Sequence, residues 1–224
     1  MRVFQLLDSN VKCEIFIHDG EKVKKGDIIA RITGSTRALL KGERTALNIV
    51  QHMSGVATAT NRCVELVKGT KASVADTRKT LPGLRVLQKY AVTVGGGKNH
   101  RYNLSDAVML KDNHIGAAGG ITEAVKRARA YVSFVNKIEV EVENIDMARE
   151  AAEAGADIIM LDNMTNEDMA KAVEMTNGKA LLEASGNVTS ETIRAIAETG
   201  VDIISIGAIT HSVKAFDISM KMEK

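Results

Sequence analysis

The sequence predicts a parallel α/β barrel of about six to seven strands, joined to a small, partial N-terminal α+β sandwich domain that a C-terminal strand completes. Three observations lead to this prediction. Strand-like and helix-like segments alternate through the second half of the chain, polar residues recur at a nearly constant interval where the predicted strands end, and the first part of the chain has a different, β-rich pattern. A doubly wound open sheet is the alternative architecture.

The N-terminal part of the chain has the pattern of short strands. Between residues 11 and 32 apolar and polar side chains alternate around Asp19-Gly20, which is typical of strands joined by tight turns. From about residue 38 to residue 68 apolar residues recur at helical spacing, with an interruption near Ser54-Gly55. We therefore expect residues 1–68 to form a partial β segment followed by one long or broken connecting helix.

The second half of the chain alternates strand and helix. Strand-like segments occur at residues 72–75, 107–110, 137–142, 157–161, 180–184 and 202–206, with helical segments at 144–154, 166–176 and 189–199. Glu141, Asp162 and Glu183 are each 21 residues apart, and Ser205 follows after 22. This interval matches one strand-helix unit of a barrel, so we expect residues 69–212 to form the catalytic barrel domain. The polar residues at the strand ends would then converge on the face that forms active sites in such barrels.

The last segment of the chain has a third pattern. Residues 216–222 alternate strictly between apolar and polar side chains, which is typical of a half-buried strand. We expect residues 213–224 to return to the N-terminal domain as its C-terminal strand.

Composition limits the classes of function. The 224 residues carry 30 basic and 28 acidic side chains, so the net charge of +2 gives no general attraction to nucleic acid or to an anionic membrane. Cys13 and Cys63 lie fifty residues apart without metal-ligand spacing, which predicts neither a zinc site nor a disulfide framework. No apolar run approaches the roughly 20 residues that span a bilayer, and no export signal is recognisable. We expect a cytoplasmic protein.

Cationic side chains are dense between residues 76 and 114. They lie in three motifs, Asp76-Thr77-Arg78-Lys79-Thr80, Asn99-His100-Arg101 and Lys111-Asp112-Asn113-His114. Arginine binds a carboxylate or phosphate through a planar fork, and lysine supplies a mobile point charge. The motifs therefore predict a pocket for a small polyanion, in which Asp76, Asp112 and Asn113 serve the backbone and His114 forms a loop hydrogen bond.

Two glycine-containing loops follow the last predicted strands. Ala184-Ser185-Gly186-Asn187 and Ile206-Gly207-Ala208 are each expected to place backbone N–H groups near the start of a helix, where phosphate binds. Each loop alone also fits an ordinary tight turn. Their position on the last two strands favours phosphate binding.

These motifs resemble those of the quinolinate phosphoribosyltransferase family, the carboxylating nicotinate-nucleotide pyrophosphorylases. The resemblance runs from about residue 4 to residue 220 and includes Glu43-Arg44-Thr45-Ala46-Leu47-Asn48, Asp76 to Thr80, Gly95 to Arg101, Lys111 to His114, Leu161-Asp162-Asn163 and Glu183-Ala184-Ser185-Gly186. It implies transfer of a phosphoribosyl group from phosphoribosyl pyrophosphate to quinolinate, with decarboxylation to nicotinate mononucleotide in NAD biosynthesis. Compared with the family pattern, this chain begins inside the first domain, so we expect a shortened N-terminal domain.

The resemblance also implies roles for individual residues. The quinolinate carboxylates would be bound by Arg78, His100 and Arg101, joined by Arg44 from the second subunit of a homodimer or larger homo-oligomer. The catalytic set would be Lys79 and Lys111, near the ribosyl donor and the reacting centre, with Glu141 and Asp162 facing the ribose and the Mg²⁺ on the diphosphate. The protein itself would have no direct metal site. The 5-phosphate would be held by Ser185, Gly186, Asn187, Gly207 and His211.

Two other classes of function remain as alternatives. One is a weak or inactive relative that binds phosphorylated ligands, and the other is an unrelated phosphate-binding barrel isomerase or aldolase. A simple phosphate-binding barrel does not need Arg78, His100, Arg101 and Lys111 together, and an inactive relative should lack at least one of them.

Overall fold

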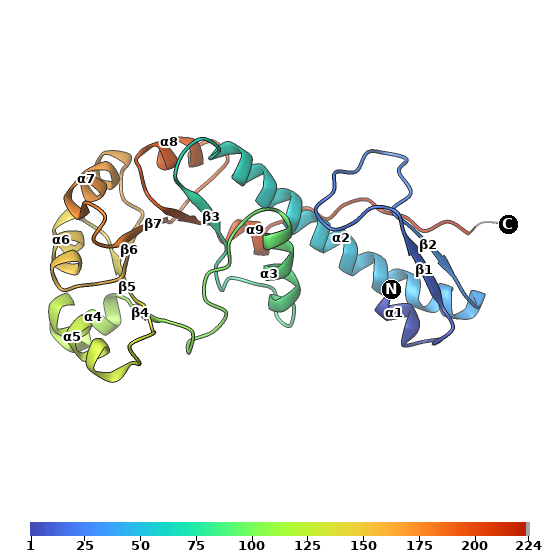
Figure 1. Ribbon diagram of the computed structural model, residues 1–224, viewed down its shortest axis with the longest axis horizontal. Helices are drawn as coiled ribbons and strands as arrows, with labels where there is room; N and C mark the ends of the chain where they lie inside the picture. Colours follow the sequence, from blue (N-terminus) through green and yellow to red (C-terminus); the bar gives the residue numbers. More distant parts are fainter. Residues whose placement is uncertain (223–224) are drawn as a thin grey trace.

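The computed structural model describes residues 1–222 and consists of a small N-terminal lobe and a larger barrel, connected by one long helix (Figure 1). None of the helices in these residues has the length and apolar content to cross a bilayer. The elements in chain order are α1 (Arg2–Gln5), β1 (Lys12–Ile15), β2 (Ala30–Thr33), α2 (Thr36–Leu66), β3 (Ser73–Ala75), α3 (Arg85–Val94), β4 (Val108–Leu110), α4 (Asp112–Ala118), α5 (Ile121–Tyr131), β5 (Ile138–Val142), α6 (Ile145–Glu153), β6 (Ile158–Asp162), α7 (Asn166–Thr176), β7 (Leu181–Ser185), α8 (Ile193–Glu198), β8 (Ile203–Ser205) and α9 (Ala208–His211).

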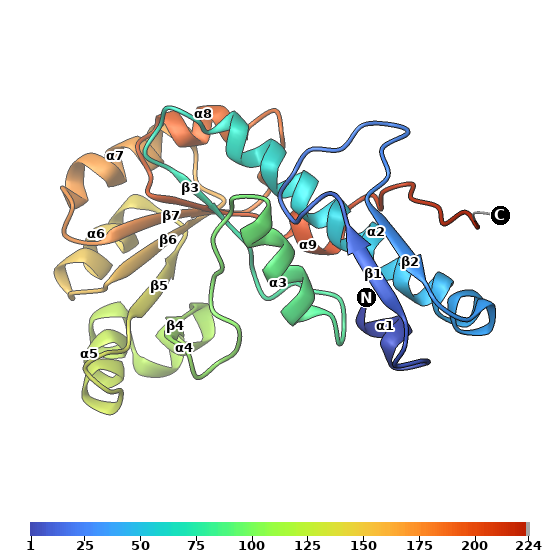
Figure 2. The same ribbon diagram turned by 45° about the vertical axis from the view of Figure 1, so that its right-hand side comes forward.

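Six parallel strands form the wall of the barrel, in the order β3-β8-β7-β6-β5-β4. An isolated parallel bridge between Ala75 and Lys98 extends the wall beyond β3. The helices that follow the strands cover the outer face of this curved sheet (Figure 2). The predicted parallel barrel is therefore confirmed, and the predicted strand positions agree with the observed ones to within one or two residues.

Strand β5 shows how alternation divides the barrel into an outer core and a polar interior. Ile138, Val140 and Val142 have no exposed surface and belong to the main hydrophobic core. Successive side chains of a strand point to opposite faces, so Glu139 and Glu141 point into the barrel. The glutamates at every second position of this segment therefore lie on the interior face of the barrel wall.

Helix α2 is continuous across residues 54 and 55, so of the two predicted alternatives, one long helix or a broken one, the long helix is correct. A Cβ atom at Gly55 would collide with the carbonyl oxygen of Lys214. The glycine is therefore needed because the C-terminal segment packs directly against the helix, and it does not end the helix.

Residues 213–222 return to the N-terminal lobe, as predicted, but they form no strand. The N–H of Phe216 donates to the carbonyl of Gln51 (3.0 Å), and Nε2 of Gln51 donates to the carbonyl of Ile218 (2.7 Å). Because the partner is the side of α2, no ladder of backbone hydrogen bonds forms. The predicted C-terminal strand is therefore wrong, and its last two residues, 223 and 224, lie outside the described part of the chain. Within residues 1–222 the N-terminal sheet consists of β1 and β2 alone.

Candidate active site

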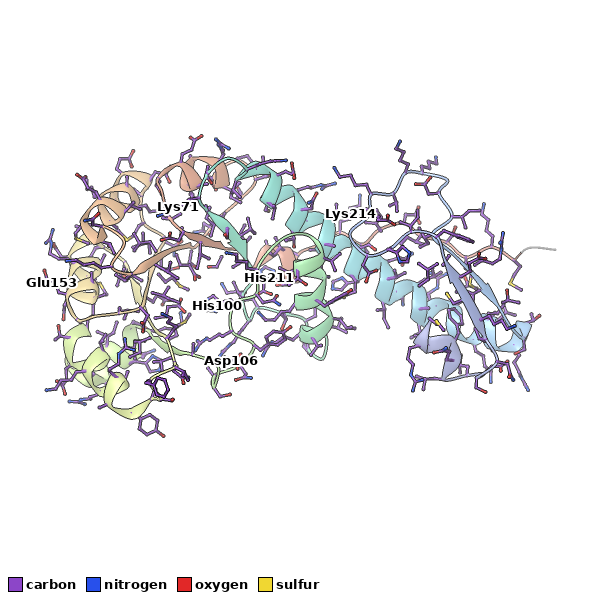
Figure 3. All side chains as sticks on the ribbon, in the orientation of Figure 1. Lys71, His100, Asp106, Glu153, His211 and Lys214 are labelled. Carbon is purple, nitrogen blue, oxygen red and sulfur yellow. The ribbon has the colours of Figure 1, made fainter. Side chains whose placement is uncertain are left out.

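The carboxyl ends of the barrel strands meet at one end of the barrel, because all six strands are parallel. Asp76 directly follows β3, Lys111 follows β4, and β6 and β7 end at Asp162 and Ser185. The loops after β3 and β4 carry Arg78, Lys79 and Lys111, and the segment between α3 and β4 carries His100 and Arg101. Figure 3 shows His100 at this end, between the strands and helix α3.

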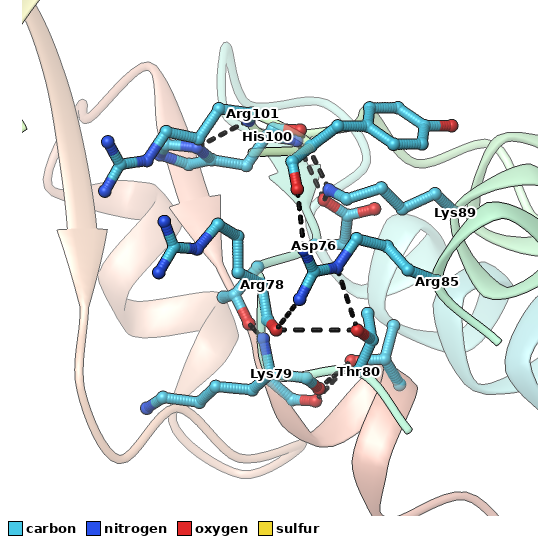
Figure 4. A network of polar contacts seen from close by, with 12 residues as sticks. Asp76, Arg78, Lys79, Thr80, Arg85, Lys89, His100 and Arg101 are labelled. Atoms are coloured by element: carbon cyan, nitrogen blue, oxygen red, sulfur yellow. Dashed lines mark hydrogen bonds and ion pairs between the residues drawn. The ribbon is translucent and has the colours of Figure 1, made fainter. Parts of the chain in front are cut away.

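Arg78 and Arg101 come from different loops, and their guanidinium groups point to the same side (Figure 4). Arg101 is held in place from behind, since Nη1 donates to the carbonyl of Ala107 (3.1 Å) and Nη2 to the sulfur of Met109 (3.2 Å). Burial, followed by the charge of Arg78, lowers the pKa of Arg101. Nη1 of Arg78 is buried and has no hydrogen-bond partner within residues 1–222. The pair is therefore arranged to receive an anion.

His100 lies against two glutamates that have almost no exposed surface. Nε2 is 3.3 Å from Oε2 of Glu139 and 3.5 Å from Oε2 of Glu183, and we name these three residues the carboxylate–histidine cluster. Burial disfavours the charged ring, but the hydrogen bonds and charges of the two glutamates outweigh it and raise the pKa of His100 to about 10. Burial also raises the pKa of Glu139, with a smaller contribution from the charge of Glu183. The cluster therefore retains a proton at neutral pH.

The position of that proton follows from the other ring nitrogen. Nδ1 of His100 accepts the backbone N–H of Arg101 at 2.7 Å, so the ring carries its single N–H at Nε2, and the further proton that the cluster retains lies on the two carboxylates. Both ring nitrogens are thus engaged within the protein. The same three residues bring ligand atoms within 4.8 Å of one another, as a metal site would, but the Nε2–H between the carboxylates makes this a hydrogen-bonded group.

Lys111 and Glu141 form an ion pair across the ends of β4 and β5. At the next strand end, Oδ2 of Asp162 accepts a hydrogen bond from Nδ2 of Asn163 at 2.9 Å. The barrel thus brings two carboxylates and an ammonium group together at adjacent strand ends, as the sequence predicted. Lys79 is exposed on the loop after β3 and extends toward the same side as Arg78 (Figure 4).

The loop after β7 is a tight turn without a helix directly behind it. Gly186 has a φ of +91°, and a Cβ atom there would collide with Oδ1 of Asn163. The same Oδ1 accepts a hydrogen bond from Nδ2 of Asn187 at 3.0 Å. Helix α8 begins only at Ile193, so the expectation that this loop lies at a helix start is wrong. The reason is a separate turn closed by the Thr189 and Thr192 side chains.

The loop after β8 does lie at a helix start, since Gly207 is the N-cap of α9. A Cβ atom at Gly207 would lie 3.0 Å from Cδ of Lys79 and 3.1 Å from Nε2 of His211. Nδ1 of His211 is 2.6 Å from the hydroxyl of Ser212. The glycine backbone is therefore flanked by one lysine and one histidine side chain, an arrangement suited to a phosphate.

Two predictions about structural residues are confirmed. Nδ1 of His114 accepts the N–H of Lys111 at 3.0 Å, so this histidine forms a structural hydrogen bond as predicted, although it lies in the first turn of α4 and not in a loop. Asp76 is completely buried and paired with Lys89 at 2.5 Å, so it serves the structure of the loop.

Arg44 lies away from the residues described so far. It is exposed on the first half of α2, which extends from the barrel toward the N-terminal lobe (Figure 1). Sequence reasoning also missed four residues of the site, Glu139, Glu183, Arg85 and Lys89. The alternation of Glu139 with apolar residues and the 21-residue interval that ends at Glu183 were signals for the two glutamates, whereas nothing in the sequence indicated the contacts of Arg85 and Lys89.

The fold and the site define an α/β-barrel protein that binds a multiply charged acid beside a phosphorylated ligand. Residues 56–221 match the model of the quinolinate phosphoribosyl transferase C-terminal domain, and residues 1–54 match that of the N-terminal domain. The boundary between the two matched domains lies within α2. This chain belongs to the quinolinate phosphoribosyltransferase family.

Individual relatives agree with this assignment. A probable nicotinate-nucleotide pyrophosphorylase [carboxylating] of Bacillus subtilis is 48% identical over 217 residues, which cover 97% of this chain and 75% of the relative. A mitochondrial quinolinate phosphoribosyltransferase [decarboxylating] of Nicotiana glauca is 44% identical over 240 residues, covering 99% of this chain and 68% of the relative. The crystal structure of NadC from Streptococcus pyogenes superposes with a TM-score of 0.95 at 49% identity, covering 99% of this chain and 78% of that one.

Proposed function

We propose that this protein transfers the phosphoribosyl group of phosphoribosyl pyrophosphate to the ring nitrogen of quinolinate and releases the 2-carboxylate, giving nicotinate mononucleotide, pyrophosphate and CO₂. The observation that carries the proposal is the convergence of Arg78, Arg101, Lys79 and Lys111 on one end of the barrel, beside two carboxylates. The two substrates together carry two carboxylates, a phosphate and a diphosphate, and such charges need several fixed cations.

Quinolinate binds to Arg78 and Arg101. The fork of Arg101 is already oriented by Ala107 and Met109, so little side-chain entropy is lost on binding. His100 helps to position Arg101, because its Nδ1 accepts the backbone N–H of that residue. Arg44 would reach quinolinate from the second subunit of a homodimer or larger homo-oligomer, since in its own chain it lies on the half of α2 that extends away from the barrel.

The ribosyl donor binds on the opposite side of the site. Its 5-phosphate would contact the loops at Ser185, Gly186 and Asn187 and at Gly207 and His211. The Mg²⁺ that the diphosphate carries as part of the substrate fits the carboxylate oxygens of Glu141 and Asp162, because oxygen ligands suit this ion. Lys79 and Lys111 would stabilise the charge that develops on the leaving diphosphate.

No side-chain nucleophile is needed for this reaction. Holding the nitrogen of quinolinate close to C1 of the ribose, with cations on both acids, supplies positioning and electrostatic stabilisation. Once the nitrogen is alkylated, its positive charge stabilises the carbanion that remains at C2 when the bond to the neighbouring carboxylate breaks and CO₂ leaves. The carbanion then takes up a proton from water, which gives nicotinate mononucleotide. Since Arg78, His100, Arg101 and Lys111 are all present at one end of the barrel, an active enzyme is favoured over a relative that only binds phosphorylated ligands.

Steady-state turnover tests the proposal. We expect formation of nicotinate mononucleotide from quinolinate and phosphoribosyl pyrophosphate, dependence on Mg²⁺, and weak competition by nicotinate, which lacks one carboxylate. Turnover of nicotinate at the same rate, or no product from quinolinate, would contradict the proposal. Free thiols at Cys13 and Cys63 are compatible with a reducing cytoplasm as the place of this reaction.

A further inference from the structure

The two substrate arginines repel each other, as the influence of the Arg78 charge on the pKa of Arg101 shows. Their guanidinium groups point the same way in Figure 4, and Nη1 of Arg78 has no partner within residues 1–222. Like charges in a partly buried site push apart the loops that carry them. Another part of the protein therefore has to hold the two loop backbones together.

A buried ion pair makes the first connection. Nζ of Lys89 donates to Oδ1 of Asp76 (2.5 Å) and to the carbonyl of His100 (2.8 Å), while the N–H of His100 donates to the same Oδ1 (2.8 Å). Neither side chain of the pair has exposed surface. Both backbone polar groups of His100, the residue before Arg101, are thus bound by the pair.

Arg85 makes the second connection, and Figure 4 shows it between the two loops. Nη2 donates to the carbonyl of Arg78 (3.2 Å), and Nη1 donates to the carbonyl of Tyr102 (2.8 Å). One planar guanidinium therefore spans the loop of Arg78 and the loop of Arg101. Arg85 and Lys89 are four residues apart on α3, so they lie on the same face of that helix.

Stability alone does not explain why these residues are charged. Burial lowers the pKa of Lys89 and raises that of Asp76, and the attraction between the two only partly offsets this cost. A buried ion pair can often be replaced by apolar side chains without loss of stability. Directional hydrogen bonds to the backbone of His100 are what an apolar pair would not supply.

We propose that Asp76, Lys89 and Arg85 are positioning residues for quinolinate, and we name them the α3 clamp. They set the separation of Arg78 and Arg101 so that both forks meet one substrate. This inference rests on the proposed function.

The α3 clamp acts on quinolinate much more than on the ribosyl donor. The carbonyl of Lys79 is held by the hydroxyl of Thr210, at 2.8 Å, and this contact does not involve the clamp. Loss of the clamp should therefore raise the KM for quinolinate and leave the KM for the ribosyl donor almost unchanged. A general loss of stability would affect both constants alike.

Arg85→Met tests the clamp, with Arg194→Met as the matched control. Nη1 of Arg194 also donates to a backbone carbonyl, that of Lys68 (2.9 Å), far from the site. We expect Arg85→Met to raise the KM and the calorimetric Kd for quinolinate at least about tenfold, the equivalent of one charge-assisted hydrogen bond, and the donor KM less than about twofold. Arg194→Met should change none of these constants.

A pair of variants separates positioning from folding. Lys89→Met alone leaves a buried carboxylate unpaired and should lower the midpoint of thermal unfolding, whereas Asp76→Asn with Lys89→Met removes both charges and should recover most of it. The quinolinate KM of the double variant should stay raised. A double variant with the wild-type quinolinate KM, or equal increases for both substrates, would overturn the clamp.

The binding measurement also separates the two proposals. If the wild type binds quinolinate and the clamp variants bind it equally well, only the clamp is wrong. If the wild type binds no quinolinate, the proposed function and the clamp are both wrong.

Discussion

Replacing Arg101 with alanine should strongly weaken quinolinate binding without weakening the fold. A hydrogen bond to a charged group contributes about 1.5 to 3 kcal/mol, and each 1.4 kcal/mol is about tenfold in affinity, so the loss of one such bond predicts an increase in the quinolinate Kd of roughly 10-fold to 150-fold. Since the fork of Arg101 is oriented before substrate arrives, little of this free energy is spent on ordering the side chain.

The same substitution has an unusual expected effect on stability. The pKa of Arg101 is lowered by burial and by the charge of Arg78, which means that the folded protein disfavours this charge. Alanine removes the repulsion, so the midpoint of thermal unfolding should stay the same or rise while affinity falls. Arg101→Lys should be intermediate in affinity, because an ammonium group cannot replace the fork.

Calorimetric titration with each substrate and differential scanning calorimetry provide the measurements. Arg149→Ala is the control, because Arg149 lies on the outer helix α6 in a surface ion pair with Asp146. If Arg101→Ala weakens binding of the ribosyl donor as much as that of quinolinate, or lowers the unfolding midpoint by many degrees, the reasoning is refuted.

Three further predictions concern other parts of the site. Gly186→Ala and Gly178→Ala both place alanine at positive φ, which should lower the folding stability of each variant by about 1–2 kcal/mol. Only at Gly186 would the new Cβ atom meet a side chain, that of Asn163, so only Gly186→Ala should raise the KM for the ribosyl donor. The pKa of the carboxylate–histidine cluster is about 10, against about 6.5 for histidine in the unfolded chain. The free energy of unfolding, measured in urea, should therefore fall as pH rises between these two values, and it should fall less in Glu139→Gln. Mixing inactive Arg44→Ala and Arg101→Ala proteins should restore part of the turnover if Arg44 acts across subunits, and no recovery after subunit exchange would contradict that arrangement.

Much of the barrel could be predicted because its signals are local. The strands from β3 to β8 are short segments rich in apolar residues, and the nearly constant interval between Glu141, Asp162 and Glu183 reflects one strand-helix unit per repeat. Two of the three cationic motifs begin directly after β3 and β4, so the predicted positions of those strands also gave the positions of Arg78 and Lys111, whereas Asn99-His100-Arg101 lies between α3 and β4. Glycine loops after β7 and β8 were recognisable for the same reason.

Two of the differences from the predictions involve partners that are distant in the sequence. Gly55 looked like a helix interruption because the segment that packs on it, near Lys214, could not be known from the helix alone. The alternating C-terminal residues looked like a strand, but the surface available to them is the side of α2 near Gln51. Extended backbone becomes a strand only where another strand offers matching N–H and C=O groups.

The sequence by itself determined where strands and helices lie, which end of the barrel carries the charge, and which cations form the site, because periodicity and short motifs express these locally. Only the tertiary structure decided what those cations face. The curved parallel sheet buries Glu139 and Glu183 beside His100, and helix α3 brings Lys89 and Arg85 to two loops that repel each other. Contacts of this kind depend on the distance between atoms in space, and the spacing of residues along the chain does not specify that distance.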